Sequence, residues 1–340
     1  MITYNKRWYD IKSLVGNTWA RVFVICGARG CGKTYSIQDL FLSQWKKYRR
    51  PFVWLRISKV SVDKLMRNKA SDLFDRKLAE FYDLKGNLAV KGQYVYDLSI
   101  DPDMRQPMCR VMALSEYAKD KGVAHFDDNY DDYLNICLDE CIREEGERVM
   151  FDLTRALSGT IENLTRTKEE KVRFFLTCNM LEDAGDVFCA LNFIPEKWGR
   201  YKLRSKRAIV DIVPPSEKYI EDRKKSLASI FTPDDSNFTN ARPLDRSLLY
   251  KGRLMRPQYI IKFDKGPESW FVVWERNVVC RYNKEKLSVA VAMRGYKDEM
   301  FNPMARDDVY AQYHGRCFLF RDLITQKMFE KELEALRPRG

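Results

Sequence analysis

Short apolar runs alternate with polar or amphipathic stretches over the first two thirds of the chain. The run at Leu134–Leu138 is nearly all apolar, as expected for a strand that is covered on both faces. Strands separated by helices predict an α/β fold with a mostly parallel sheet. The expected strands are Arg21–Cys26, Phe52–Ile57, Cys109–Leu114, Leu134–Leu138 and Val172–Cys178, the expected helices run from Lys33 to Lys46 and over Arg148–Leu164, and a hairpin is expected around Gly92.

The pattern changes near Pro214–Pro215. The segment Ser216–Phe231 opens with a serine and an acidic first turn and then becomes basic, as a capped helix does. The following residues, Thr232–Arg246, have the Pro, Asp and Asn content of a linker. We therefore expect a first domain over residues 1–215, a helical linker over 216–240 and a smaller α+β domain over 241–340. The strands expected in this last part are Tyr259–Phe263, Trp270–Glu275, Val278–Tyr282 and Leu287–Met293, followed by a helix over Asp322–Leu336.

The composition narrows the class of protein. Sixty Lys and Arg against 48 Asp and Glu leave a formal charge of +12, which favours nucleic-acid or anionic-membrane contact but also fits a plain basic surface. No apolar run is long enough for a membrane span or a signal peptide, so a soluble cytoplasmic protein is expected. Nine cysteines without a CxxC pair, and only two histidines, argue against zinc. Cys26, Cys137 and Cys178 lie in or beside expected buried strands, which predicts reduced thiols.

The segment GARGCGKT, Gly27–Thr34, fits the pattern of a phosphate-binding loop between a strand and a helix. Gly27, Gly30 and Gly32, with the backbone at Cys31, let N–H groups wrap phosphate oxygens at the positive end of the helix. Lys33 can reach the β- and γ-phosphates, and the Thr34 hydroxyl can ligate Mg²⁺. A chance match is the alternative, but the flanking strand and helix argue against it. The loop therefore predicts an ATP site.

Two further strands end in residues suited to this chemistry. In LNICLDE, Leu134–Glu140, Asp139 is placed to hold Mg²⁺ and its water, and Glu140 to act on the attacking water. The alternative is a solvated strand end. Asn179 follows the next strand and is expected either to sense the γ-phosphate or to cap a turn. The three residues predict ATP hydrolysis.

Two groups of basic residues are candidates for contacts with a neighbouring subunit or with DNA. Arg166 is the preferred arginine finger, with Arg155 and Arg173 as weaker choices. Lys119 and Lys121, or the basic stretch Lys197–Arg207, can contact a phosphate backbone. A solvated basic surface explains each of them equally simply. Within the stretch, alternation on one face of a strand is expected for Lys202, Arg204 and Lys206.

Two aromatic residues lie near the N-terminus. We expect Trp8 and Tyr9 to pack rather than to form a platform for adenine.

The chain resembles the genome-packaging ATPases (DNA encapsidation proteins) of small Picovirinae-type podophages, a branch of the FtsK–HerA-type ASCE translocases. The likeness lies in GARGCGKT at 27–34, the Phe52–Arg56 strand with its arginine, LDEC at 138–141 with Ile142–Arg143, and the Arg166 segment leading into FFLTCN at 174–179. It covers most of the first 215 residues. The C-terminal likeness is vague.

The resemblance implies a bacteriophage molecular motor that uses ATP and Mg²⁺ to move double-stranded DNA. An ASCE ATPase domain, a helical linker and an RNase H-like C-terminal domain would form a homopentameric ring on the portal vertex of a procapsid in the host cytoplasm. By this analogy Arg166 acts in trans on the neighbour's ATP, and Lys119 or Lys121 is the trans-acting lysine. The choice of lysine, the need for a scaffold RNA, the host, the step size, the coupling and the ring stoichiometry stay open.

Related C-terminal domains in larger phages are metal-dependent nucleases, which need several converging carboxylates. The C-terminal sequence shows no convincing cluster of carboxylates, so a nuclease-dead domain is expected. The carboxylates considered are Asp264, Glu275, Asp307 and Asp308. Two alternatives remain: a terminase-like protein with an active nuclease, and an assembly protein that binds nucleotide as a switch. DNA-stimulated ATP turnover and plasmid cleavage with Mn²⁺ would separate them.

Overall fold

The computed structural model describes residues 2–5, 8–116, 134–141, 153–165, 172–179, 186–195, 197–227, 247–263, 269–283 and 306–335. The chain divides into two compact units. The first comprises Met1–Glu182 and Pro195–Arg242, and the second comprises Asp183–Ile194 and Pro243–Gly340. The sequence placed residues 183–194 in the first domain, whereas in the structure they group with the C-terminal unit.

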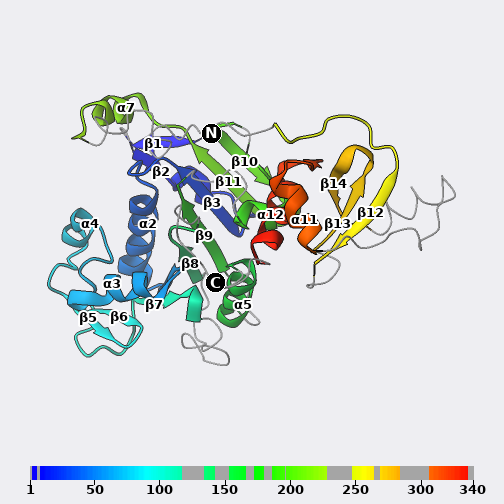
Figure 1. Cartoon of the computed structure of the whole chain (residues 1–340). Helices are drawn as coiled ribbons and strands as arrows, with labels where there is room; N and C mark the ends of the chain where they lie inside the picture. Colours follow the sequence, from blue (N-terminus) through cyan, green and yellow to red (C-terminus); the bar gives the residue numbers. More distant parts are fainter. Residues whose placement is uncertain are drawn as a thin grey trace. The chain divides into compact units, whose positions relative to one another are not determined.

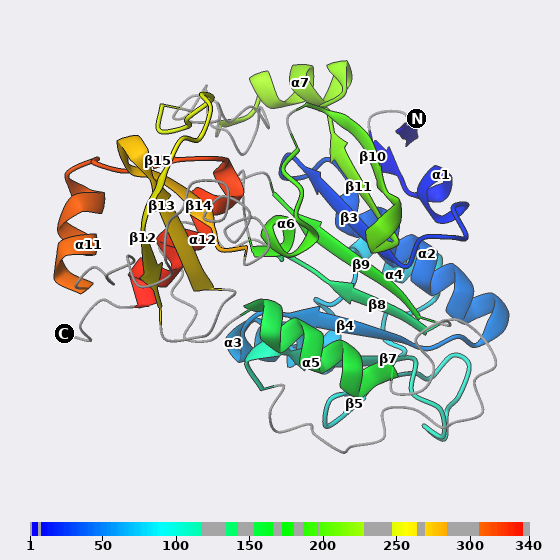
Figure 2. The same ribbon diagram turned by 90° about the vertical axis from the view of Figure 1, so that its right-hand side faces the viewer.

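The first unit is built on a sheet in which nine strands are described, in the order β10-β11-β3-β9-β8-β4-β7-β6-β5 (Figure 2). The six strands from β11 to β7 run parallel, and the antiparallel pairs lie at the two edges. Continuous apolar runs and parallel pairing agree, because a parallel sheet is covered on both faces. The strands are β3 (Val22–Gly27), β4 (Phe52–Arg56), β5 (Leu88–Lys91), β6 (Tyr94–Asp97), β7 (Cys109–Ala113), β8 (Leu134–Leu138), β9 (Val172–Cys178), β10 (Gly199–Leu203) and β11 (Ala208–Val213).

Helices cover both faces of this sheet. Figure 1 shows α2 and α5 on opposite faces. The buried stripe of α2 includes Phe41, whose ring lies 5.3 Å from that of Phe175 on β9 and 5.2 Å from that of Phe52 on β4. The predicted α/β fold with a mostly parallel sheet is therefore confirmed. The helices and N-terminal strands of this unit are β1 (Thr3–Asn5), β2 (Trp8–Asp10), α1 (Lys12–Val15), α2 (Lys33–Tyr48), α3 (Lys59–Ala70), α4 (Arg76–Phe81), α5 (Leu153–Thr165) and α7 (Glu217–Lys224).

The predicted helix at Ser216–Phe231 is shorter in the structure. The Ser216 hydroxyl accepts a hydrogen bond from the Tyr219 N–H, as the capping prediction requires, but α7 ends at Lys224. Residues 228–246 lie outside the described residues, and they include the linker-like segment Thr232–Arg246 and the second half of the predicted linker over 216–240. Within the described ranges, no helix combines the length and the apolar character that crossing a bilayer requires.

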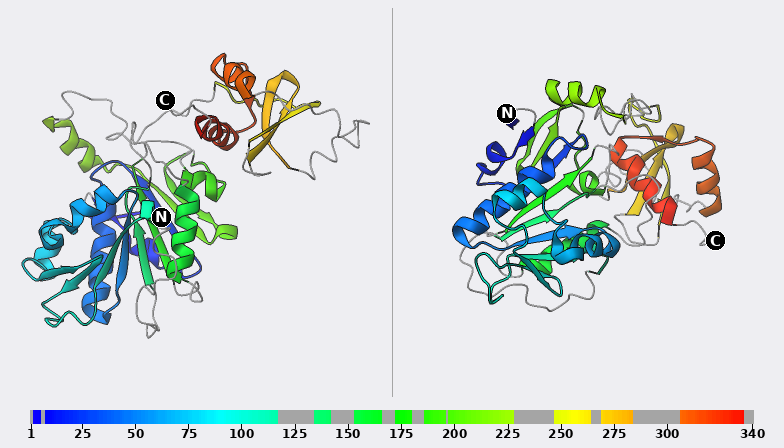
Figure 3. Two further views of the ribbon diagram at one scale, coloured as in Figure 1. Left: turned by 60° about the horizontal axis from the view of Figure 1, so that its bottom comes forward. Right: turned by 90° about the vertical axis from the view of Figure 1, so that its left-hand side faces the viewer.

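The second unit has a smaller sheet in the order β12-β13-β14-β15, in which only β14 and β15 pair in parallel among the described strands. Figure 3 shows α11 (orange) and α12 (red) beside these strands, and Phe329 of α12 packs on Phe271 and Phe320. The smaller sheet domain predicted at the C-terminus is therefore confirmed, while the expected strand Leu287–Met293 lies outside the described residues. The elements are α6 (Asp186–Leu191), β12 (Pro257–Lys262), β13 (Trp270–Trp274), β14 (Val278–Arg281), α11 (Arg306–His314), β15 (Leu319–Phe320) and α12 (Leu323–Ala335).

The prediction that Cys26 and Cys178 are reduced is wrong for this structure, in which a disulfide joins them. The two residues are direct partners on β3 and β9, with their Cα atoms 4.9 Å apart. The sequence around each cysteine does not indicate that residues 152 positions apart lie on neighbouring strands. Cys137 on β8 is a buried free thiol as expected, and burial raises its pKa well above the usual value.

Candidate functional site

The loop from Gly27 to Thr34 connects the end of β3 to the first turn of α2. Gly30 and Gly32 have φ angles of +77° and +97°, in the left-handed region that glycine adopts without strain. A Cβ atom at Gly27 would lie 3.0 Å from Cβ of Val213 on β11 and 3.1 Å from Sγ of Cys31. Side chains at these positions would disturb the loop. Because glycine has none, a ligand can approach the loop backbone closely.

Lys33 brings a positive charge into this loop. Its side chain is buried, and its Nζ donates hydrogen bonds of 2.9 Å to the carbonyls of Gly27 and Ala28 and of 3.2 Å to Oδ1 of Asn179. Burial lowers the pKa of Lys33 because it penalises the cation, and the negative charge of Asp139 nearby opposes that shift. A cation within a cradle of glycine backbone fits a phosphate group.

Asp139 lies beside this cation at the end of β8. Its buried carboxylate accepts hydrogen bonds from the hydroxyls of Thr34, at 3.0 Å, and of Thr177, at 2.5 Å. Its other oxygen is 2.9 Å from a guanidinium nitrogen of Arg56. Thr34 and Asp139, predicted as the Mg²⁺ ligands, are thus in direct contact. A hydroxyl and a carboxylate next to a phosphate cradle are oxygen donors of the kind that Mg²⁺ takes.

Glu140 follows Asp139 in a strained turn. Its φ angle of +60° lies in the left-handed region, which is unfavourable for a residue with a side chain. The turn is held by Thr177, which accepts the Glu140 N–H with its hydroxyl at 3.3 Å and the Cys141 N–H with its carbonyl at 2.8 Å. The Glu140 carboxylate is more than half exposed and forms an ion pair with Arg56. The backbone thereby turns Glu140 outward, where its carboxylate can reach water.

Arg56 bridges the two acidic residues, and sequence reasoning did not assign it a role in the site. It ends β4, which is the neighbour of β8 in the sheet, and its guanidinium contacts both Asp139 and Glu140. An arginine that ends an apolar strand was the available signal. What the sequence lacked was the strand order that puts this end next to Asp139.

Two other segments contact the phosphate loop from outside the predicted motif. The Tyr9 N–H of β2 donates to the Cys31 carbonyl at 2.9 Å. From α7, the Tyr219 hydroxyl at 2.5 Å and the Arg223 guanidinium at 3.0 Å donate to the carbonyl of Arg29. These bonds fix the orientation of the loop's peptide groups, and no local pattern indicates them.

The structure does not test several predicted basic residues. Arg166, Lys119 and Lys121 lie outside the described residues. Arg155 is exposed on α5. Arg173 lies at the start of β9, at the opposite end of that strand from Asn179, and donates to the side chains of Asn135 and Gln44. The role of Arg155 or Arg173 as an alternative finger stays a prediction.

The predicted alternation of Lys202, Arg204 and Lys206 along a strand is wrong. The strand β10 ends at Leu203, and Arg204–Lys206 form a 3-10 turn that leads into β11. The hairpin turn therefore interrupts the strand periodicity. Within the same basic stretch, the guanidinium of Arg200 is almost fully buried against Asp211 and is not available to DNA.

Only part of the carboxylate set considered for the C-terminal unit is described. Glu275 follows β13 in a 3-10 turn, and its carboxylate is 3.8 Å from Arg256, whereas the side chains of Asp264, Asp307 and Asp308 lie outside the described residues. Across the ranges that the structure describes, no group of three or more His, Cys, Asp and Glu side chains converges as a metal site.

Known proteins resemble this chain in sequence. The family model of the podovirus DNA encapsidation protein (Gp16) matches residues 5–309. The DNA packaging proteins of Bacillus phage PZA and Bacillus phage phi29 are each 27% identical to it over 205 residues, which are 60% of this chain and 55% of theirs. The chain thus spans little more than half the length of these relatives.

Two solved structures share the fold over nearly the whole chain. The Phi-28 gp11 DNA packaging motor matches with a TM-score of 0.65 at 15% identity, over 99% of this chain and 100% of that one. The bacteriophage Phi-29 viral genome packaging motor assembly matches with a TM-score of 0.60 at 16% identity, again over 99% and 100%. At these identities the likeness is one of fold.

Proposed function

The chain belongs to the podovirus DNA encapsidation protein (Gp16) family, and we propose that it is an ATP-hydrolysing motor subunit that moves double-stranded viral DNA into a procapsid. The observation that carries the proposal is the contact of Thr34 with Asp139 beside the buried Lys33. A cation in a glycine loop, next to a hydroxyl and a strand-end carboxylate, suits a nucleoside triphosphate with Mg²⁺.

In this proposal the loop from Gly27 to Thr34 wraps the phosphates and Lys33 neutralises their charge. Thr34 and Asp139 hold Mg²⁺, and bound ATP with Mg²⁺ supplies the phosphoryl group that is transferred to water. Glu140 orients the attacking water and accepts its proton. Asn179 keeps the Lys33 ammonium in place through the 3.2 Å hydrogen bond and responds to the γ-phosphate.

Arg56 sets the position of Glu140 in this proposal. Its guanidinium holds one oxygen of the Glu140 carboxylate and leaves the other oxygen for the attacking water. The other terminal nitrogen of the same guanidinium stays paired with Asp139. Arg56 therefore couples the position of the base to the metal ligand.

The assembly part of the proposal rests on the resemblance. Subunits form a homo-oligomeric ring, a pentamer by resemblance, on the portal (connector) of a procapsid in the host cytoplasm. Arg166 acts on the neighbour's ATP, where it meets charge that develops in the transition state. Lys119 or Lys121 is the second trans-acting group. The resemblance leaves open whether a scaffold RNA joins the assembly.

The domain roles follow the same proposal. Residues 1–215 carry the ATPase, 216–240 form the helical linker, and 241–340 form an RNase H-like domain without nuclease activity. The net charge of +12 supports contact with the DNA backbone, which is independent of sequence.

The test measures ATP turnover by the purified protein with and without double-stranded DNA, followed by DNA packaging into purified procapsids. Stimulation by DNA and protection of DNA inside the capsid support the motor. Nucleotide binding with negligible turnover in both conditions would contradict it and favour a nucleotide switch. Plasmid cleavage with Mn²⁺ would instead identify an active nuclease.

A further inference from the structure

The indole of Trp8 lies against the phosphate loop. A Cβ atom built on Gly32 would be 3.2 Å from Cβ and 3.4 Å from Cε3 of Trp8, so the side chain covers the glycine that precedes Lys33. Trp8 is nevertheless 39% exposed, while its neighbour Tyr9 is 2% exposed. Tyr9 is packed as expected, and Trp8 packs on the loop while keeping part of its surface in solvent.

Hydrogen bonds fix the position of Trp8 relative to the loop. Besides the bond from the Tyr9 N–H to the Cys31 carbonyl, the Ser36 hydroxyl donates to the Tyr9 carbonyl at 3.0 Å and accepts the Ile11 N–H at 3.2 Å. Ser36 belongs to the first turn of α2, three residues after Lys33. Hydrogen bonds therefore tie β2 to the phosphate loop and to the first turn of α2.

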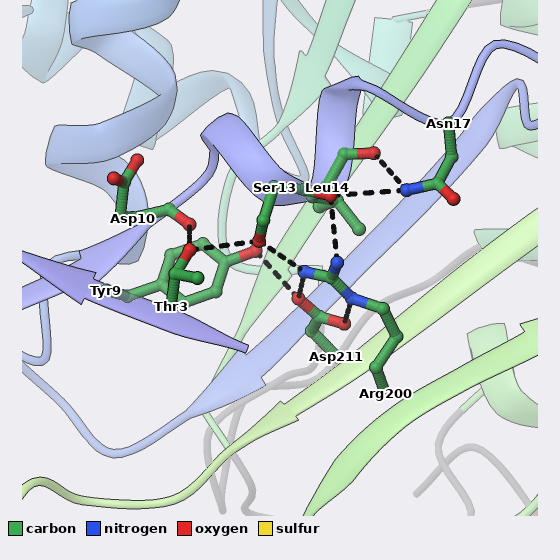
Figure 4. A network of polar contacts seen from close by, with 8 residues as sticks. All are labelled: Thr3, Tyr9, Asp10, Ser13, Leu14, Asn17, Arg200 and Asp211. Atoms are coloured by element: carbon green, nitrogen blue, oxygen red, sulfur yellow. Dashed lines mark hydrogen bonds and ion pairs between the residues drawn. The ribbon is translucent and has the colours of Figure 1, made fainter. Parts of the chain in front are cut away.

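A buried polar network anchors the same segment to the sheet (Figure 4). The Tyr9 hydroxyl donates to Oδ2 of Asp211 at 2.9 Å, and both Asp211 oxygens lie 2.7 Å from Arg200 nitrogens. Arg200 also donates to the carbonyl and hydroxyl of Ser13 at 2.9 and 3.1 Å. A satisfied buried network is rigid, so it holds β2 and α1 in one arrangement.

We propose that Trp8 is the base-binding residue of the nucleotide site, stacking its indole on the purine ring of ATP. The inference rests on the proposed ATP site and adds the base to it. A partly exposed indole at the phosphate loop offers a contact that the backbone cradle lacks, since the loop binds phosphates alone. Stacking tolerates any base, so Trp8 separates nucleotides from inorganic phosphate chains more than it separates one purine from another.

The test compares binding of ATP with binding of inorganic triphosphate, both with Mg²⁺, by calorimetry. Trp8→Ala should weaken ATP binding by roughly 5- to 100-fold and leave triphosphate binding unchanged. Trp8→Phe should bind ATP with an affinity between those of Trp8→Ala and the unmodified protein. Trp198→Ala is the matched control, because Trp198 is an equally large aromatic that is 50% exposed elsewhere in the same unit. It should bind both ligands as the unmodified protein does.

Tryptophan emission gives a second readout that does not depend on turnover. ATP should change the emission of the unmodified protein and of Trp198→Phe, and this change should be absent in Trp8→Phe. Equal weakening of ATP and triphosphate by Trp8→Ala would mean that Trp8 only supports the loop, and no weakening of either would remove it from the site; both overturn the inference alone. If the unmodified protein binds neither ligand, the proposed ATP site fails as well.

Discussion

The hydroxyl of Thr34 donates a 3.0 Å hydrogen bond to Oδ1 of Asp139, which joins the first turn of α2 to the end of β8 across 105 residues of sequence. The two residues can meet because each follows a strand of the parallel sheet, and the carboxyl ends of these strands lie at one edge. The bond locates the phosphate cradle and the acidic residues in one site, and the following predictions test what each residue does there.

Lys33→Ala should abolish ATP binding and turnover, because among the described residues no other cation contacts the Gly27 and Ala28 carbonyls that Lys33 Nζ contacts. The fold should persist, since burial disfavours the lysine cation. Calorimetry with ATP and a thermal melt measure the two effects. Lys47→Ala, an exposed lysine at the other end of α2, is the control. Turnover near that of the control would remove the loop from the mechanism.

Glu140→Gln should bind ATP with Mg²⁺ normally and hydrolyse it about 10²- to 10⁴-fold more slowly, since the amide cannot accept a proton from water. Single-turnover kinetics separate binding from the chemical step. Glu162→Gln changes an exposed glutamate on α5 and should leave turnover intact. A loss of only a few-fold in Glu140→Gln would place the base elsewhere.

Arg56→Ala should destabilise the first unit, because it leaves the buried Asp139 carboxylate without its cationic partner. Breaking a buried ion pair from one side costs up to about 3–5 kcal/mol. Urea unfolding measures the effect. The double variant Arg56→Ala/Asp139→Asn removes the uncompensated charge and should regain part of the loss, so equal stability of the single and double variants would contradict the argument.

Tyr9→Phe tests the buried network at high pH. Burial, followed by the neighbouring Asp211, raises the pKa of Tyr9 well above its usual value. The unfolded chain releases this proton near pH 10, at about the unperturbed value. The stability due to Tyr9 is therefore complete below about pH 10 and is lost as the pH rises further.

The variant should accordingly show a shallower decline of the unfolding free energy above about pH 10, together with a loss of about 1 kcal/mol at neutral pH from the missing hydrogen bond. Tyr48→Phe, at a side chain that is half exposed, is the control. If the alkaline decline is parallel in all three proteins, the Tyr9 hydroxyl does not act in this way.

Arg166→Ala tests whether the motor works across a subunit boundary. A trans arginine is worth about 10³- to 10⁵-fold in rate, so the variant should bind nucleotide and lose hydrolysis. Mixing it with Glu140→Gln should restore some turnover, because one interface then combines an intact Glu140 with an intact Arg166. Co-assembly without any recovery would show that Arg166 acts within its own subunit or only in the structure.

The sequence by itself determined the chemistry that local patterns encode. The loop Gly27–Thr34 needs glycine, lysine and threonine at set positions, and the structure brings its Thr34 into contact with the Asp139 that the sequence also singled out. The Asp139–Glu140 pair was recognisable because it ends an apolar run after such a loop. The parallel sheet was also predictable, since strands covered on both faces are apolar throughout.

Only the tertiary structure decided which strand ends and loops meet. It placed Arg56 against Asp139 through the neighbouring order of β4 and β8, and it paired Cys26 with Cys178 across two strands. It also distinguished Trp8 from Tyr9, which look alike in sequence but differ in exposure, at 39% and 2%. Strand order and long-range register depend on how the whole core packs, and no short stretch of sequence carries that information.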